Sequence, residues 1–154
     1  MNDTIHESVP AHRQPSDEAI AYFQDCRRLL GISDTWHLWL EVADAPYGNE
    51  EADGAADLEA RYLKGTIIYR RNLTDARRPF VLMHEAFHVV FAPLQLAHDR
   101  VVELLPEALQ THARELLCDA EEQIIEQLTR ALQAQITPPK DDAVTPSDTD
   151  KESS

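Results

Sequence analysis

The segment from Phe80 to Phe91 constrains this chain most, because it is apolar on every side and yet contains two histidines and a glutamate. Its sequence is Phe-Val-Leu-Met-His-Glu-Ala-Phe-His-Val-Val-Phe. A helix that is apolar all round is a buried helix. Unpartnered imidazole or carboxylate groups inside it would cost several kcal/mol. We therefore expect a buried helix in which His84, Glu85 and His88 have a specific partner.

The spacing His84-Glu85-x-x-His88 predicts a metal as that partner. Residues four apart lie on one helix face, one turn from each other, so both imidazoles can bind the same zinc ion. Glu85 follows about 100° further round the helix, where it misses the metal but can act as general base on water beside it. If the residues of this chain were shuffled at random, the pattern would occur in roughly three of every hundred shuffled chains. The motif therefore indicates metal-assisted hydrolysis.

A purely structural explanation of the same three residues remains open. Buried histidines can be satisfied by backbone carbonyl groups, and Glu85 could pair with Arg77 or Arg78. In that case the helix would need no metal.

Composition limits the other functions that the chain could have. The formal net charge of −14 repels nucleic-acid phosphates, so we expect no DNA or RNA partner. The N-terminal residues lack the apolar core of a secretory signal, and His and Glu interrupt the longest apolar stretch before it is long enough for a membrane span. Cys26 and Cys118 lie far apart in helical patterns and indicate no disulfide framework. We expect a soluble, cytoplasmic protein.

Three regions differ in composition along the 154 residues. Residues 1–15 predict a flexible arm, residues 16–136 a single domain, and residues 137–154 a disordered acidic tail. Within the domain, the acidic stretch 43–60 resembles a solvated loop, although a strand is possible within residues 40–62.

The pattern of apolar residues and of helix-capping residues predicts the order of the elements. Ser16 can cap a first helix that Gly31 ends, and Thr74 or Asp75 can cap the motif helix, which Pro93 should stop. We expect helices over residues 16–30, 75–92 and 112–135, strands over 36–42 and 65–69, and a short helix within 94–111, broken at Pro106. This order predicts an α+β fold, with helices on one face of a small, largely antiparallel sheet.

A catalytic zinc needs a third protein ligand, which the sequence must supply outside the motif. A metzincin is excluded, because Phe91 and Leu94 stand where its longer motif has Gly and His. The remaining acidic candidates lie on the next long helix, and the helical phase places Glu121 in the middle of its apolar stripe. We therefore predict Glu121 as the ligand, with Glu122 as the alternative if the helix is rotated modestly.

Other assignments of these residues stay open. Glu121 could instead pair with Arg114 or Arg130. The further candidates for the third ligand are Glu115, Asp119, His98 and His112, and those for a donor to the reacting carbonyl oxygen are His98, His112, Tyr62 and Tyr69.

The motif His84-Glu85-x-x-His88, with an acid in a helix 33 residues after His88, resembles the gluzincin metallopeptidases. Within that group it is most similar to the small intracellular ImmA/IrrE-like and phage-encoded forms, over about Trp36 to Leu132. The resemblance implies a minimal zincin fold in which His84, His88 and Glu121 bind Zn²⁺ and Glu85 is general base and then proton donor. It also implies an extended peptide substrate paired with an edge strand, for which we expect the strand Thr66–Tyr69, with Gly65 allowing close approach of a backbone.

These observations lead to a hypothesis about function. We expect a zinc-dependent endopeptidase that acts on a protein of the bacterial or phage-infected cytoplasm. The alternatives are a zincin scaffold that binds zinc or a partner without cleaving it, and hydrolysis of a non-peptide amide. The presence of Glu85 favours catalysis, since a structural zinc site needs no base.

Overall fold

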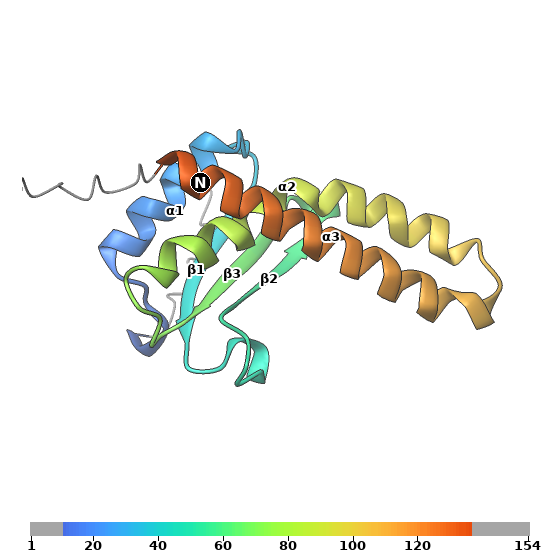
Figure 1. Ribbon diagram of the computed structural model, residues 1–154, viewed down its shortest axis with the longest axis horizontal. Coiled ribbons are helices and arrows are strands. Elements are labelled where there is room, and N and C mark those ends of the chain that lie inside the picture. Colours follow the sequence, from blue (N-terminus) through green and yellow to red (C-terminus); the bar gives the residue numbers. More distant parts are fainter. Residues whose placement is uncertain (1–10, 137–154) are drawn as a thin grey trace, which may run out of the picture.

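The computed structural model describes residues 11–136 and has the α+β fold expected from the sequence (Figure 1). The expected tail 137–154 and the first ten residues of the expected arm lie outside the described residues. The elements follow one another as η1 (Ala11–Arg13), α1 (Asp17–Leu29), β1 (His37–Ala43), η2 (Pro46–Gly48), β2 (Gly54–Glu59), η3 (Ala60–Tyr62), β3 (Lys64–Arg70), α2 (Arg77–Glu103) and α3 (Glu107–Ile136). The described end of the arm, η1, contacts β1, and Arg13 pairs with Glu41 there.

The three strands form a mixed sheet in the order β1-β3-β2. β2 and β3 are antiparallel, as expected for strands joined by the short η3 turn, whereas β1 pairs with β3 in parallel. The sheet is therefore not largely antiparallel, because β1 pairs with the free side of β3 rather than with β2. The possible strand within residues 40–62 is confirmed as β2, and the arrangement leaves it at an edge of the sheet.

α1 begins and ends where local chemistry predicts. The Ser16 hydroxyl accepts a hydrogen bond from the Ala19 backbone N–H. At the other end Gly31 adopts a φ of 65°, and the N–H groups of Gly31 and Ile32 donate to the carbonyls of Arg28 and Arg27. This pair of bonds is a Schellman motif, in which glycine supplies the left-handed residue.

α2 carries the histidine motif and is longer than the sequence predicted. The residue at its N-cap position is Ala76, which makes no side-chain cap bond, rather than the expected Thr74 or Asp75. Thr74 instead starts the turn that leads into the helix, since its hydroxyl and its carbonyl both accept from the backbone N–H of Arg77. The expected stop at Pro93 is wrong, because the helix continues through Pro93 to Glu103. An internal proline removes one helical hydrogen bond and costs about 3 kcal/mol, which the burial of side chains on both sides of it, such as Val89 and Val102, offsets.

α2 and α3 are antiparallel neighbours and extend past the edge of the sheet as a helical hairpin (Figure 1). Pro106 does interrupt the helical conformation as expected, since it lies in the turn between α2 and α3, and α3 begins directly after it at Glu107. Residues 94–103 belong to α2 instead of forming a separate short helix.

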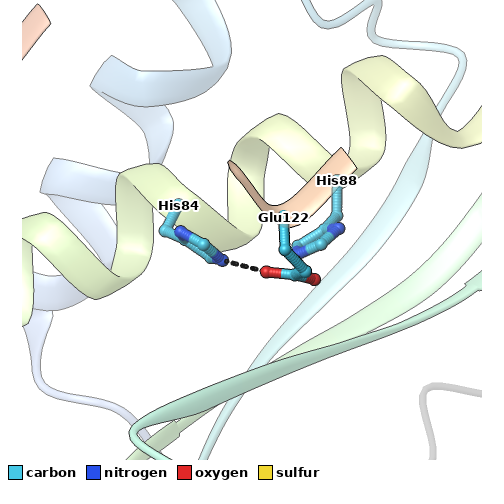
Figure 2. Close-up of side chains that lie close together, drawn as sticks. All are labelled: His84, His88 and Glu122. Atoms are coloured by element: carbon cyan, nitrogen blue, oxygen red, sulfur yellow. Dashed lines mark ion pairs between the residues drawn. The ribbon is translucent and has the colours of Figure 1, made fainter. Parts of the chain in front are cut away.

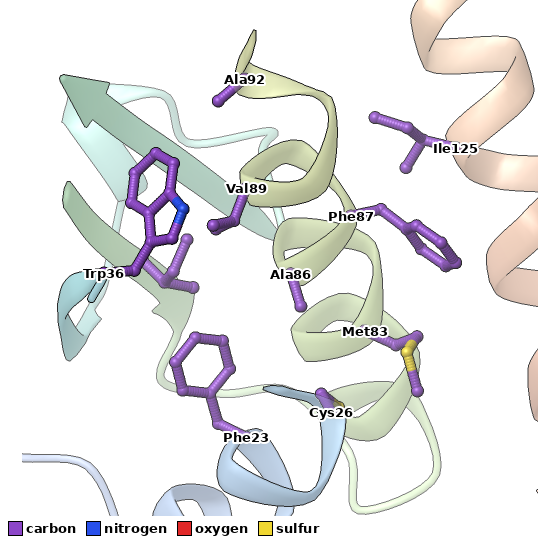
Figure 3. Packing of buried hydrophobic residues seen from close by; sticks show 10 residues of the cluster. Phe23, Cys26, Trp36, Met83, Ala86, Phe87, Val89, Ala92 and Ile125 are labelled. Carbon is purple, nitrogen blue, oxygen red and sulfur yellow. The ribbon is translucent and has the colours of Figure 1, made fainter. Parts of the chain in front are cut away.

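The main core lies between the sheet, α1, α2 and α3 (Figure 3). Ala86, Val89 and Ala92 of α2 face Trp36 and the strands, while Met83 and Phe87 face Ile125 of α3. The helices thus cover one face of the sheet, and α2 is the element on which the others pack.

The burial of α2 bears on the question of a membrane. Among the described residues, α2 is long and apolar enough to cross a bilayer by length and composition, with a mean hydropathy of 1.4. A core helix meets the same criteria, and α2 contacts α1, α3, β2 and β3.

Candidate metal centre

His84 and His88 project from the same face of α2 toward a cleft beside the sheet edge. Their ring centroids are 5.2 Å apart, as the four-residue spacing requires. Phe80, one turn earlier, stacks on the His84 ring at 6.3 Å. The first two expected ligands are therefore adjacent and oriented together.

Glu122 of α3 is the carboxylate that meets the two imidazoles (Figure 2). Its Oε2 lies 3.2 Å from Nε2 of His84, and its Oε1 lies 3.3 Å from Nε2 of His88. One ligand atom from each of the three residues falls within 4.8 Å of the others. Two imidazoles and one carboxylate are the donor set of many catalytic zinc sites.

Glu121, the ligand preferred from the sequence, is not in this group. It is only 7% exposed and points into the contact between the helices, where Gln95 donates a hydrogen bond to its Oε1 at 2.5 Å. The helical phase located the buried face of α3 correctly, but the metal cleft lies beside that face, about 100° round the helix. The alternative, Glu122, occupies that flank.

The other ring nitrogen of each histidine faces a second carboxylate. Glu121 Oε1 lies 3.5 Å from Nδ1 of His88, and Glu126 Oε2 lies 3.7 Å from Nδ1 of His84. Nδ1 of His84 is buried and has no hydrogen-bond partner among the described residues. Histidines that bind metals commonly direct the second N–H at a carboxylate, which orients the ring and leaves Nε2 for the metal.

Glu85 lies in the wall of the same cleft, only 5% exposed. A Cβ atom on Gly54 of β2 would come within 2.6 Å of its Oε1, so only glycine lets the strand pass this close to the carboxylate. Burial raises the pKa of Glu85 to about 7; the charge of His84 opposes this rise and that of Glu122 adds to it. A carboxyl group with such a pKa can exchange protons at neutral pH.

The electrostatics of the metal-free site couple the histidines to Glu122. Burial lowers the pKa of His84, but its hydrogen bond with Glu122 and the charges of Glu85, Glu122 and Glu126 outweigh that effect and raise it. Burial lowers the pKa of His88, and the charge of His84 lowers it further, against the charge of Glu122. The hydrogen bond from His84 lowers the pKa of Glu122 despite its partial burial, with help from the two imidazole charges. The shifts of Glu122 and His88 favour the ionised carboxylate and the neutral imidazole, which are the forms that bind a metal, whereas the raised pKa of His84 favours its protonated form, whose proton a metal would displace.

The cleft has a volume of about 500 Å³ and runs along the edge strand. The five residues of β2 from Gly54 to Leu58 line one side of it, and the opposite side consists of His84, Glu85, His88, Gln95 and Glu122. The strand beside the site is thus β2. The expected strand, β3, is the centre of the sheet with both its edges paired, so it cannot pair with a substrate. Gly65 does allow a close approach, but that of Asp57 and Leu58 within the sheet.

The remaining candidates from the sequence lie away from the three ligands. Tyr69 is in the core, Tyr62 is exposed on η3, and His112 is exposed next to Glu115. His98 lines a separate hollow between α2 and α3, and neither Glu115 nor Asp119 belongs to the metal-binding group.

The structural explanation without a metal is not supported by the ion pairs. Arg77 pairs with Asp53, and Arg78 pairs with Asp75 and Glu18, so neither arginine neutralises Glu85. Glu121 likewise does not pair with the two expected arginines; Arg130 pairs with Glu126. Glu85 therefore remains a buried acid directed at the cleft.

Three residues of the site were missed in the sequence. Glu126 lies four residues after Glu122, a spacing that could have suggested that both face the motif. Gln95 lies seven residues after His88 on the same face of α2, but the expected stop at Pro93 concealed it. Nothing local singles out Gly54.

Comparison of the chain with protein-family models, with curated proteins and with solved structures gave no match. The structure by itself therefore defines the class: an α+β domain whose two longest helices bring His84, His88 and Glu122 close enough to bind a metal ion. The donor set and the orientation of both rings fit zinc.

Proposed function

We propose that this chain is a zinc-dependent metallopeptidase of the gluzincin type, an endopeptidase that hydrolyses a cytoplasmic protein substrate. The observation that carries the proposal is the convergence of His84, His88 and Glu122 on one side of a cleft that also contains Glu85 and a free strand edge. A metal site, a base and a place for an extended chain are what peptide hydrolysis by this route requires.

In this proposal His84, His88 and Glu122 hold the metal. The carboxylates of Glu121 and Glu126 lie 3.5 Å and 3.7 Å from Nδ1 of His88 and of His84, where their charge favours a proton on Nδ1 and leaves Nε2 for the metal. Zinc held there would polarise the scissile carbonyl and lower the pKa of a coordinated water toward neutrality. Gln95 fixes Glu121, so the carboxylate can support His88 without entering the metal site.

Glu85 performs the proton transfers. Its carboxylate is buried next to His84 and faces the cleft, so it can take a proton from the attacking water and pass it to the leaving amine nitrogen. The backbone of Gly54 closes the other side of Glu85 and limits its rotation.

The edge of β2 is the place for the substrate. One side of this strand is paired with β3, and the other side has no strand partner among the described residues. An extended peptide can add to such an edge through main-chain hydrogen bonds, which positions its carbonyl groups across the cleft. The negative net charge argues against a nucleic-acid substrate.

The first test concerns the metal. Purified protein should bind one zinc ion, and His84→Ala should lose it, whereas His112→Ala, which changes an exposed histidine of α3, should retain it. An unchanged zinc content in His84→Ala would remove the metal site and the peptidase with it.

The second test concerns catalysis. Glu85→Gln should retain zinc and lose about 10²- to 10⁴-fold in turnover, the usual contribution of a general base. Glu115→Gln, an exposed acid on α3, is the matched control and should keep full turnover. If Glu85→Gln kept the biological activity of the wild type, the chain would be a scaffold that binds zinc or a partner without cleaving it.

A further inference from the structure

A second hollow of about 300 Å³ lies next to the metal cleft, between η3 and the part of α2 that follows His88. Most of its lining is apolar, from Leu58, Ala60, Tyr62, Ala92 and Leu96. Its remaining lining is polar, and Asp99 of α2 and Arg61 of η3 are part of it. The hollow thus differs in character from the metal cleft, which is lined mainly by polar groups.

The hollow continues the metal cleft along the edge strand. Leu58 and Gln95 line both, so the two spaces share a boundary formed by one residue of β2 and one of α2. A chain that follows the edge of β2 from Gly54 toward Glu59 passes the histidines first and then reaches this hollow.

The distance from the metal centre to the second hollow can be expressed as a number of residues of an extended peptide. The midpoint of Ala92 and Leu96 lies eight residues along α2 from the midpoint of His84 and His88, or about 12 Å at 1.5 Å per residue. An extended peptide advances about 3.3 Å per residue. The hollow is therefore three or four peptide residues away from the metal centre.

We propose that this hollow is a specificity pocket, which receives a large apolar side chain three or four residues from the peptide bond that lies at the metal centre. The inference rests on the proposed peptidase function and adds the class of substrate: an extended segment with a Leu, Ile, Met or Phe at that position. Burial of such a side chain against Leu96 and Tyr62 strengthens binding roughly ten- to a hundredfold.

Zinc-loaded Glu85→Gln protein and a positional-scanning library of terminally blocked dodecapeptides provide the test, with equilibrium binding as the readout. We expect one position of the bound peptides to be enriched in large apolar residues. Two variants made in the Glu85→Gln background, Leu96→Asp and Tyr62→Ser, should each remove that enrichment and weaken binding about ten- to a hundredfold. Tyr62 is exposed on η3, so its replacement leaves the core unchanged. Leu94→Asp is the matched control, because Leu94 is an exposed leucine of α2 outside the hollow and should have no effect.

The outcomes separate this inference from the proposed function. Binding without an apolar preference, no binding at all, or a preference that survives both variants would overturn the specificity pocket. Digestion of the same peptides by the zinc-loaded wild type tests the peptidase independently. Peptides that bind with the preference but are never cleaved would contradict the peptidase and leave the pocket in place.

Discussion

The two halves of the α2–α3 hairpin have opposite characters. We call residues 77–92 and 121–136 the sheet-backed half, and residues 93–103 and 107–120 the projecting half. Eight of the nine buried residues of α2 lie in the sheet-backed half, and so do Glu121, Ile125 and Thr129 of α3. Leu104, in the turn that joins the helices of the projecting half, is 86% exposed, and polar residues such as His98 and Arg114 lie along the contact between those helices.

All three candidate metal ligands belong to the sheet-backed half. A metal site needs ligands held within about 0.5 Å, and side chains locked by a packed core supply that precision. The projecting half has few buried apolar contacts, which are the mark of a region that opens locally at low cost. Packing against the sheet therefore fixes the positions of the metal ligands, while the projecting half only extends the surface next to them.

The largest expected effect contrasts two residues of α3. Ile125 is fully buried against Phe87, so Ile125→Ala should destabilise the metal-free protein by about 2–5 kcal/mol. Leu116 in the projecting half is 57% exposed, so Leu116→Ala should change the free energy of unfolding by less than about 0.5 kcal/mol. Urea denaturation measures both, and equal losses would break the comparison between the halves.

The second effect is the pH dependence that the buried Glu85 imposes on the sheet-backed half. The pKa of Glu85 is about 7 in the folded protein and near 4.5 in the unfolded chain, so the folded protein holds the proton more tightly. The free energy of unfolding therefore falls as the pH rises from 4.5, the unfolded pKa, to about 7, the folded pKa. The metal-free Glu85→Gln protein should match the wild type near pH 4.5 and be more stable by roughly 3 kcal/mol above pH 8. Urea titrations of both proteins in chelator give this difference directly, and a difference independent of pH would contradict the assignment.

The third effect separates the two neighbouring acids at the junction of the halves. Glu122→Gln removes a proposed ligand and should weaken zinc binding by more than about a hundredfold, whereas Glu121→Gln removes only a partner of the His88 ring and should cost about tenfold. Competition with a zinc chelator measures both affinities. A larger loss for Glu121→Gln would restore Glu121 as the ligand.

The smallest effect concerns the approach of the sheet to the site. In Gly54→Ala the new methyl group would meet Glu85 and Val81, so we expect about tenfold lower turnover with unchanged zinc content, because the variant touches no ligand. Steady-state kinetics and metal analysis check the two parts. Full turnover in this variant would show that the strand can move away without disturbing Glu85.

Local signals in the sequence predicted most of the elements and part of the site. Ser16, Gly31 and Thr74 act as helix signals through bonds to residues at most five positions away. The pair His84 and His88 depends only on the geometry of one helix turn. The continuation of α2 past Pro93 could not be predicted in this way, because the packing that outweighs the lost hydrogen bond comes from distant segments.

The sequence alone determined that this chain has a buried helix with two adjacent imidazoles and a neighbouring carboxylate, since that follows from its own 3.6-residue period. Only the tertiary structure decided that Glu122 rather than Glu121 meets those imidazoles, and that β2 rather than β3 borders the cleft. Both outcomes depend on how whole elements are placed: the rotation of α3 about its axis, and the side of β3 on which β1 pairs. These are settled by the fit of the assembled core, which no local stretch of residues contains.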